Sequence, residues 1–212
     1  MKWIDYAAPH SVRGAVDLLG QAGDKARIMA GGTDLLVQLR LRAYDLDLVV
    51  DGKGIPDLNE LTYDPINGLT VGAAVPCYRI YGNAAVAQAY PGLIDAISAI
   101  GGTQIQGRAS LGGNLCNAAP SADSIPPMIA LNATARIAGP NGTREVAVED
   151  FCTGVRQTVI GQGEILTSIH FPPPEANTGA HYLRFTPRNE MDIAVAGAGV
   201  SVTLNNGNIA SA

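Results

Sequence analysis

Two glycine pairs with polar neighbours constrain this chain more than any other feature of its sequence. The first, Gly31-Gly32-Thr33-Asp34, follows a short apolar run, and the second lies within Ser110–Asn114. Glycine allows positive φ angles and lets backbone N–H groups approach a ligand without obstruction by a Cβ atom. The Ser, Thr and Asn side chains add neutral donors that suit phosphate oxygens. Each pair alone is explained by a tight turn, but together they favour a binding site that holds a diphosphate from two sides.

The residues around the first pair predict a helix that begins at Leu35, and a second helix is expected from Asp123. The N-terminus of a helix directly after the first glycine pair would add partial positive charge to a phosphate site. The charge of Asp34 would repel a phosphate, so we expect its carboxylate to point away and cap the helix. Leu35 and Leu36 are expected to anchor this helix in the core.

Local patterns along the chain predict a mixed α+β fold. Ser11 precedes apolar residues at helical spacing, and Gly23 ends the run, which predicts a helix. Short apolar runs predict strands, and turn signals such as Asp64–Gly68 predict hairpins. Helices and hairpins are grouped rather than alternating, which favours α+β over a doubly wound sheet. The predicted strands cover 26–30, 46–50, 58–63, 69–71, 134–138, 143–148, 164–171, 180–185 and 193–204, and the predicted helices cover 12–22, 35–41, 84–90, 91–100 and 123–131.

Two boundaries divide the chain into three parts. Lys53-Gly54-Ile55-Pro56 separates a first unit of residues 1–54 from a second unit of residues 55–175, and the prolines 172–174 end the second. The stretch after Gly101-Gly102 is rich in Gly and Ala and is expected to be a loop. The third part, residues 177–212, is expected to be the incomplete start of a further domain, because only four residues follow its last hairpin turn.

Composition restricts the class of partner. The 212 residues carry a net charge of -5 and 47% of them are hydrophobic, which is typical of a soluble globular protein with one or two cores. The sequence contains no run of basic residues that would indicate a nucleic-acid partner. It also contains no apolar segment long enough to span a membrane. We therefore expect a cytoplasmic protein. Cys77, Cys116 and Cys152 are far apart, so a metal site is not expected, and we interpret them as buried or half-buried thiols.

Familiar nucleotide-binding patterns are missing. No G-x-G-x-x-G occurs, which argues against a Rossmann domain. The run from Gly102 to Ala109 has the spacing of a phosphate-binding P-loop, but Arg108 replaces its lysine. No histidine lies near Ser110 in the sequence, which disfavours a serine hydrolase.

The glycine pairs, in combination with other residues, resemble one protein family. The similarity is carried by residues 27–35, Gln104-Ile105, Ser110–Asn114, Pro120 with Asp123, and Arg188 with Asp192-Ile193-Ala194. Together these residues are similar to the FAD-binding medium subunit of the molybdenum hydroxylases. This family includes the medium subunit of carbon monoxide dehydrogenase and the FAD domain of xanthine dehydrogenase. The resemblance implies a two-subdomain FAD-binding fold of the vanillyl-alcohol-oxidase (PCMH) type, followed by a C-terminal flavin-subunit domain that is incomplete here.

The resemblance also implies a set of cofactor-binding residues and no catalytic residue. Arg184 replaces a lysine that is common in the family, and Gln106-Gly107 replaces Arg-Asn, which puts a contact from that loop in doubt. We interpret Arg188 and Asp192 as a salt bridge in the third part of the chain. The FAD-binding residues implied are Arg27, Ile28, Met29, Ala30, Gly31, Gly32, Thr33, Asp34, Leu35, Ser110, Gly112, Gly113, Asn114, Cys116, Asp123, Ile165 or Leu166, and Arg184.

The function that the resemblance implies is electron transfer in an oxidoreductase complex. In this family a large subunit holds molybdopterin, a small subunit holds iron–sulfur clusters, and the FAD of the medium subunit passes electrons to an external acceptor. The flavin performs the redox chemistry, and the protein sets its orientation and potential. Two alternatives remain open at this stage, namely a self-contained FAD-dependent oxidase and a non-catalytic nucleotide-binding module.

Overall fold

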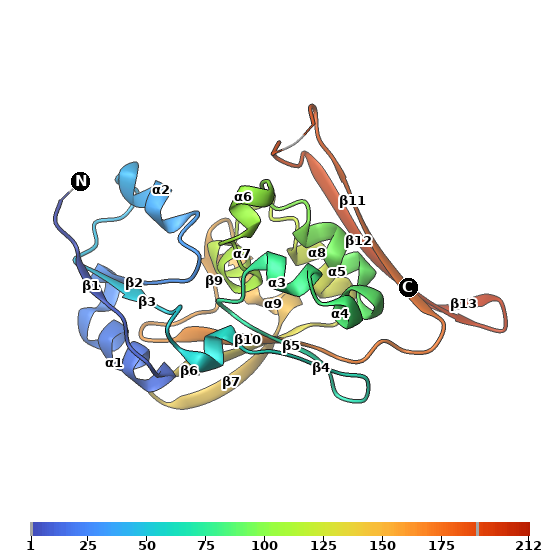
Figure 1. Cartoon of the computed structure of the whole chain (residues 1–212), viewed down its shortest axis with the longest axis horizontal. Helices are drawn as coiled ribbons and strands as arrows, with labels where there is room; N and C mark the ends of the chain where they lie inside the picture. The colour runs from blue at the N-terminus through green and yellow to red at the C-terminus, as the bar shows by residue number, and fades with distance from the viewer. Residues whose placement is uncertain (1, 190) are drawn as a thin grey trace.

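The computed structural model describes residues 2–189 and 191–212. Its first part is a three-stranded parallel sheet with strand order β1-β3-β2 (Figure 1). The Ser11 Oγ accepts a hydrogen bond from the Gly14 N–H, and Gly23 ends helix α1 with a φ of 56°, as the sequence predicts. The elements are β1 (Asp5–Ala7), α1 (Val12–Ala22), β2 (Ala26–Met29), α2 (Leu35–Arg40) and β3 (Leu48–Asp51).

The second part is a five-stranded antiparallel sheet whose helices gather on one of its sides (Figure 1). The strand order is β4-β5-β10-β6-β7, so β10 returns from late in the sequence to the centre of the sheet. The strands are β4 (Leu61–Asp64), β5 (Gly68–Gly72), β6 (Thr134–Gly139), β7 (Gly142–Ala147) and β10 (Ile165–Phe171). The helices are α3 (Cys77–Tyr81), α4 (Ala84–Ala89), α5 (Pro91–Ile97), α6 (Thr103–Gln106), α7 (Leu111–Asn117), α8 (Ile125–Ala130) and α9 (Val148–Phe151).

The described residues also form two smaller sheets. A small hairpin pairs β8 (Cys152–Gly154) with β9 (Gln157–Thr158). The third part of the chain forms an antiparallel sheet of β11 (Thr178–Phe185), β12 (Ala196–Asn205) and β13 (Asn208–Ser211). This sheet packs against α5 and α8, where a Cβ atom at Gly199 would lie 2.6 Å from the backbone of Pro126 and Pro127. Close backbone contact at Gly199 therefore fixes the sheet on α8.

One large hydrophobic core connects the first two parts. It contains Ala15 and Val16 of α1 together with Leu69, Leu93 and Ile169 from the second part, all of which are almost fully buried. A smaller apolar cluster of Met29, Leu39, Leu46 and Val49 holds α2 against the parallel sheet. The α2 helix is thus attached mainly through Leu39.

Most predicted elements are confirmed, including the four hairpin strands β4, β5, β6 and β7 and the mixed helix-and-sheet composition. The structure differs most in the stretch after Gly101, which contains the helices α6 and α7 instead of a loop. Helix α5 ends at Ile97 rather than at Ile100, and Leu58 lies in a short 3-10 helix instead of a strand. Within this stretch, Gly112 is needed for close packing, because a Cβ atom there would lie 2.5 Å from the Ala73 carbonyl oxygen. None of the described helices could span a membrane.

Candidate functional site

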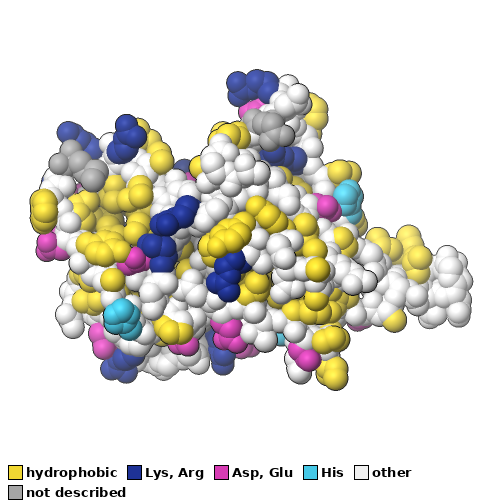
Figure 2. Space-filling model, in the orientation of Figure 1, with side chains coloured by type: hydrophobic (Ala, Val, Ile, Leu, Met, Phe, Trp, Pro, Cys, Tyr) yellow, Lys and Arg dark blue, Asp and Glu magenta, His cyan; other side chains and the backbone are white. Residues whose placement is uncertain are grey.

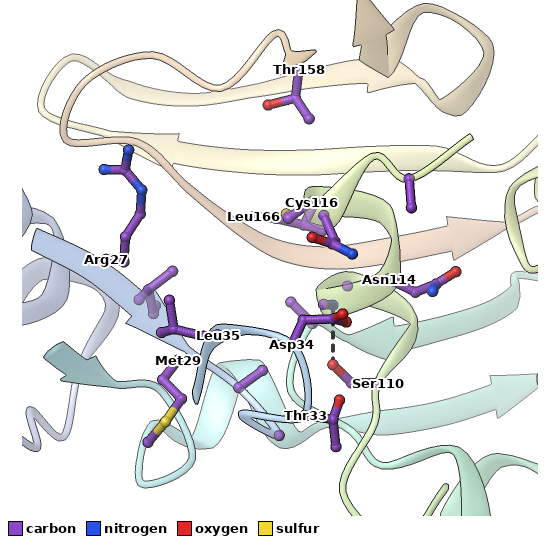
Figure 3. A pocket seen from close by; sticks show the side chains of 18 of the residues that line it. Arg27, Met29, Thr33, Asp34, Leu35, Ser110, Asn114, Cys116, Thr158 and Leu166 are labelled. Carbon is purple, nitrogen blue, oxygen red and sulfur yellow. Dashed lines mark hydrogen bonds between the residues drawn. The ribbon is translucent and has the colours of Figure 1, made fainter. Parts of the chain in front are cut away.

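A deep cleft of about 910 Å³ lies where the first and second parts of the chain meet. The β2–α2 connection forms one wall, helix α7 forms another, and the chain from β8 to β10 closes a third (Figure 3). Every residue that the sequence predicted to bind a cofactor lines this cleft. They are Arg27, Ile28, Met29, Ala30, Gly31, Gly32, Thr33, Asp34, Leu35, Ser110, Gly112, Gly113, Asn114, Cys116, Asp123, Ile165, Leu166 and Arg184.

The first glycine pair forms the turn between β2 and α2. Gly32 adopts a φ of 81°, which favours glycine, and its carbonyl accepts a hydrogen bond from the Leu36 N–H at 3.1 Å. Within the described residues, the backbone N–H groups of 31–34 donate no hydrogen bond to the protein. These four donors therefore remain free for a ligand in the cleft.

Gly31 has a different role from Gly32. A Cβ atom at Gly31 would lie 1.8 Å from the carbonyl oxygen of Arg108, so no other residue fits without moving the backbone. The Arg108 Nε also donates a hydrogen bond to the Gly31 carbonyl at 3.4 Å. The glycine at 31 thus allows the two segments to touch, which explains why both line one cleft.

The second glycine pair lies in a helix, which corrects our prediction of a loop with positive φ angles. Ser110 is the N-cap of α7, and its Oγ accepts a hydrogen bond from the Gly113 N–H at 3.1 Å (dashed line in Figure 3). A Cβ atom at Gly112 would lie 2.5 Å from the carbonyl oxygen of Ala73. Gly112 is therefore required for packing. In the first turn of α7, the backbone N–H groups of Leu111 and Gly112 donate to no partner within the described residues.

Asp34 does not have the role we expected. It occupies the N-cap position of α2, but its carboxylate makes no capping hydrogen bond. Loss of water contact in the cleft raises the pKa of Asp34, while the charge of Arg156 acts to lower it. Leu36 is 52% exposed, so the prediction that it anchors α2 in the core is wrong, because Leu39 fills that position instead.

Asp123 connects the cleft to the third part of the chain. Its Oδ1 accepts a hydrogen bond from the Tyr182 hydroxyl at 2.8 Å, and its Oδ2 lies 3.2 Å from the Arg184 guanidinium. Burial, followed by the hydrogen bond to Asp123, raises the pKa of Tyr182. Both partners come from β11, so Asp123 fixes this strand at the edge of the cleft. Arg188 and Asp192 form the predicted salt bridge at 2.9 Å.

The remaining predicted residues form apolar and cationic parts of the wall. Ile165 and Leu166 are buried on β10. Cys116 is exposed, which corrects our interpretation of this thiol as buried or half-buried. The Arg27 guanidinium lies 5.3 Å from the centre of the Tyr44 ring, and its NH1 donates to the Ala26 carbonyl. Asn114 Oδ1 accepts a hydrogen bond from Ser124, which leaves the amide NH₂ group of Asn114 free to donate.

Several residues of the cleft escaped the sequence analysis. They include Gln38, Asn117, Arg156, Thr158 and Gln162. Each is a polar residue in an unremarkable context, and they come from α2, α7 and the chain between β8 and β10. Only the folding of these three segments around one cleft reveals them, so their local sequence contained no signal.

Comparison with known proteins identifies the family. Residues 2–174 match the family described as the FAD binding domain in molybdopterin dehydrogenase. The chain belongs to this family. It is an FAD-binding oxidoreductase subunit of the molybdenum hydroxylase type, and FAD is its cofactor.

Individual relatives agree with this assignment. This FAD subunit is 33% identical over 208 residues to the xanthine dehydrogenase FAD-binding subunit of Escherichia coli O157:H7, covering 97% of this chain and 71% of that protein. It is 32% identical to the carbon monoxide dehydrogenase medium chain of Afipia carboxidovorans, covering 99% of this chain and 72% of that one.

Solved structures share the fold of this FAD subunit. Reconstituted CO dehydrogenase from Oligotropha carboxidovorans superposes with a TM-score of 0.94 at 31% identity, covering 99% of this chain and 73% of that chain. Quinoline 2-oxidoreductase from Pseudomonas putida 86 superposes with a TM-score of 0.90 at 29% identity, covering 99% and 72% respectively. The mixed helix-and-sheet fold is therefore that of the medium subunits.

Proposed function

We propose that this chain binds FAD in the cleft and transfers electrons from an iron–sulfur small subunit to an external acceptor. A large molybdopterin subunit would oxidise the substrate of the complex. The observation that carries the proposal is the meeting of two glycine segments at one cleft, with the free backbone donors of residues 31–34 between them. The cytoplasmic location expected from the sequence stays a prediction.

The residues of the cleft fit the diphosphate of FAD. Free N–H groups at 31–34 and at the start of α7 offer donors, and the glycines leave room for phosphate oxygens to approach them. Thr33 and Ser110 add hydroxyl groups to the same wall. Bound flavin would supply the redox chemistry, since it accepts and releases electrons. The chain's own contribution is to bind and orient the cofactor.

The other predicted residues complete the proposed site. Ile165 and Leu166 would pack on the ring system, and Cys116 would lie beside it. Asp123 has further lone pairs besides those used by Tyr182 and Arg184, so its carboxylate can accept one more hydrogen bond from the ribose or an amide of FAD. Arg27, Ile28, Met29, Ala30 and Leu35 would support the diphosphate turn.

We propose that residues 1–54 and residues 55–175 form the two subdomains of a fold of the vanillyl-alcohol-oxidase type. The parallel sheet ends at Asp51, and the antiparallel sheet begins at Leu61, which supports this boundary. Residues 177–212 would begin a C-terminal flavin-subunit domain. Leu183 and Phe185 on the outer face of β11 are 66% and 65% exposed, and Figure 2 shows further apolar side chains on the projecting arm of β12 and β13. Such exposed apolar surface is typical of a face that another part of the protein covers.

The experiment that tests the proposal is an absorption spectrum of the purified chain after incubation with FAD and removal of free cofactor. We expect the visible bands of bound flavin at one FAD per chain. A colourless protein would overturn the proposal and favour a non-flavin module. A yellow chain that oxidised a substrate without other subunits would contradict the electron-transfer role and favour a self-contained oxidase.

Variants at the glycines test the location of the diphosphate. Gly32→Val introduces a β-branched residue at a positive φ angle, and Gly113→Val places side-chain atoms at the first turn of α7. Both should abolish FAD binding and leave a folded protein. Gly20→Val is the matched control, because a Cβ atom at Gly20 in α1 meets nothing within 4 Å. Retention of FAD by both cleft variants would show that the diphosphate lies elsewhere.

A further inference from the structure

The positive charges of the cleft differ in whether they are already neutralised. Among the described residues, three arginines and no lysine line the cleft. Arg184 forms an ion pair with Asp123, and Arg27 lies over the ring of Tyr44. Within the described residues, no carboxylate lies within 4 Å of the Arg156 guanidinium, and its NH1 instead donates to the neutral Asn117 amide oxygen at 3.2 Å. Arg156 is thus a cation whose charge remains available to a ligand.

The position of Arg156 is fixed by its backbone. It lies in the turn between β8 and β9 with a φ of 56°, and its N–H donates to the carbonyl of Ala118 at 2.9 Å. A positive φ is uncommon for a residue with a side chain and persists where the surroundings determine it. Because Ala118 directly follows α7, the turn is attached to the helix that carries the second glycine pair.

The side chain of Arg156 is oriented by residues from two other segments. Asn117 at the end of α7 accepts the Arg156 hydrogen bond, and the same Oδ1 accepts one from Gln38 Nε2 at 2.9 Å. Gln38 lies in α2, which begins directly after the first glycine pair. The amide oxygen of Asn117 therefore joins all three walls of the cleft, and all three side chains line it.

Arg156 lies near the helix that follows the first glycine pair, because Asn117 Oδ1 joins it to Gln38 of α2. Its charge also opposes the rise in the pKa of Asp34 that burial causes. Asp34 contributes negative charge beside the free N–H groups of 31–34, which would repel a diphosphate. An arginine can offset this repulsion and donate two parallel hydrogen bonds to phosphate oxygens, which a backbone N–H group cannot do.

From these contacts we propose that Arg156 is a further cofactor-binding residue that contacts the diphosphate of FAD, and that Asn117 and Gln38 are positioning residues that orient its guanidinium. The proposal rests on the proposed location of the diphosphate at the glycine pairs. In this proposal the β8–β9 turn forms part of the third wall of the cleft and places a positive charge there.

The test compares FAD affinity in Arg156→Gln, Arg156→Lys and the wild-type chain, measured by fluorescence titration at low and at high ionic strength. At low salt Arg156→Gln should bind FAD about tenfold more weakly, since one charge-assisted hydrogen-bonding group is lost. The difference should shrink at about 1 M salt, where charges are screened over about 3 Å. Arg156→Lys should recover part of the loss, because it restores the charge without the two-pronged geometry.

Asn117→Ala and a surface control complete the experiment. Asn117→Ala should weaken FAD binding less than Arg156→Gln does, because the charge stays and only its orientation is lost. Arg136→Gln is the matched control, since Arg136 on β6 lies outside the cleft lining and its side chain is 58% exposed. Its FAD affinity should equal that of the wild-type chain at both salt concentrations.

Two results would overturn the proposal. An FAD affinity of Arg156→Gln within twofold of wild type at low salt would show that the guanidinium does not bind the cofactor. An equal loss at low and high salt would show that Arg156 only supports the fold of the turn. Failure of the diphosphate location itself is distinguishable, because Gly32→Val and Gly113→Val would then retain FAD.

Discussion

Gly31 lies against the backbone of Arg108 so closely that a methyl group on Gly31 would be 1.8 Å from the Arg108 carbonyl oxygen. The two residues are 77 positions apart in the sequence, and a hydrogen bond from the Arg108 Nε to the Gly31 carbonyl joins them as well. This contact brings the turn after β2 to the N-terminus of α7. The cleft where the first two parts of the chain meet therefore depends on a glycine whose φ angle is not positive.

The first prediction concerns this contact. Gly31→Ala should separate the two segments, because the obstructing atoms belong to the backbone and cannot rotate away. We expect FAD affinity to fall by at least tenfold and the free energy of unfolding to fall by about 1–3 kcal/mol. Gly20→Ala in α1 is the control, since its Cβ meets nothing within 4 Å and alanine favours a helix by up to about 1 kcal/mol. FAD titration and thermal unfolding measure both effects, and an unchanged Gly31→Ala would show that the segments move apart freely.

The second prediction is that substitutions at the adjacent glycines 112 and 113 of α7 differ in their effect on stability. Gly112→Ala should destabilise the fold by about 1–3 kcal/mol, because the new methyl would lie 2.5 Å from the Ala73 carbonyl oxygen. Gly113→Ala should leave stability near wild type, because its only close neighbour is the rotatable Ser110 Oγ at 3.1 Å. Thermal unfolding should therefore shift by several degrees for Gly112→Ala alone. Equal shifts for the two variants would contradict the assigned packing.

The third prediction concerns the attachment of β11 to the cleft. Tyr182 is only 4% exposed, and Tyr182→Phe removes the hydrogen bond that its hydroxyl donates to Asp123. We expect a loss of about 1–2 kcal/mol in the free energy of unfolding, measured by urea titration. Tyr78→Phe is the matched control, because Tyr78 is 49% exposed and its hydroxyl has no hydrogen-bond partner among the described residues. A loss of similar size in both variants would show that the buried hydrogen bond contributes nothing.

The fourth prediction is a dependence of stability on alkaline pH. Burial raises the pKa of the Cys77 thiol from its ordinary value of 9.0 to about 12. The unfolded chain therefore releases this proton at lower pH than the folded chain, so the stabilising effect is complete below pH 9 and is lost as pH rises toward 12. At about pH 10.5 the loss from this group should be roughly 2 kcal/mol.

Cys77→Ala removes that titration and should make the decline in stability above pH 9 shallower than in the wild-type chain. Urea unfolding at several pH values measures the two slopes, and the comparison is unaffected by the constant cost of the cavity. Parallel slopes would mean that Cys77 ionises as readily in the folded chain as in the unfolded one. Thiol labelling gives an independent check, because exposed Cys116 should react before buried Cys77.

Local sequence determined the elements whose signals come from adjacent residues. Ser11 and Gly23 define both ends of α1, and Asn83 caps α4 through hydrogen bonds from the Ala85 and Val86 N–H groups. The turn signals at 64–68 and 139–142 correctly predicted two hairpins. Such caps and turns are satisfied within a few residues, so no distant contact is needed to predict them.

Local patterns do not determine the structure where contact with a distant backbone segment decides it. The glycine pair at 112–113 predicts a loop, but both residues lie inside α7, and Gly112 packs directly on Ala73. Hydrophobicity alone predicts Leu36 in the core, whereas Leu39 is buried against the parallel sheet and Leu35 packs partly buried beside it. Intrinsic propensity is a weak guide at these positions because tertiary packing overrides it.

The sequence by itself determined one large part of the cleft lining, because the two glycine pairs and their neighbours resemble those of a family of FAD-binding subunits. Only the tertiary structure decided how each one acts. It showed that Gly31 and Gly112 make close packing contacts and that Gly32 adopts a positive φ angle. It also joined Arg156 through Asn117 to Gln38 of α2. The physical reason is that steric exclusion and electrostatic interaction depend on distance in space, and residues 31, 108 and 156 come together only when the chain folds.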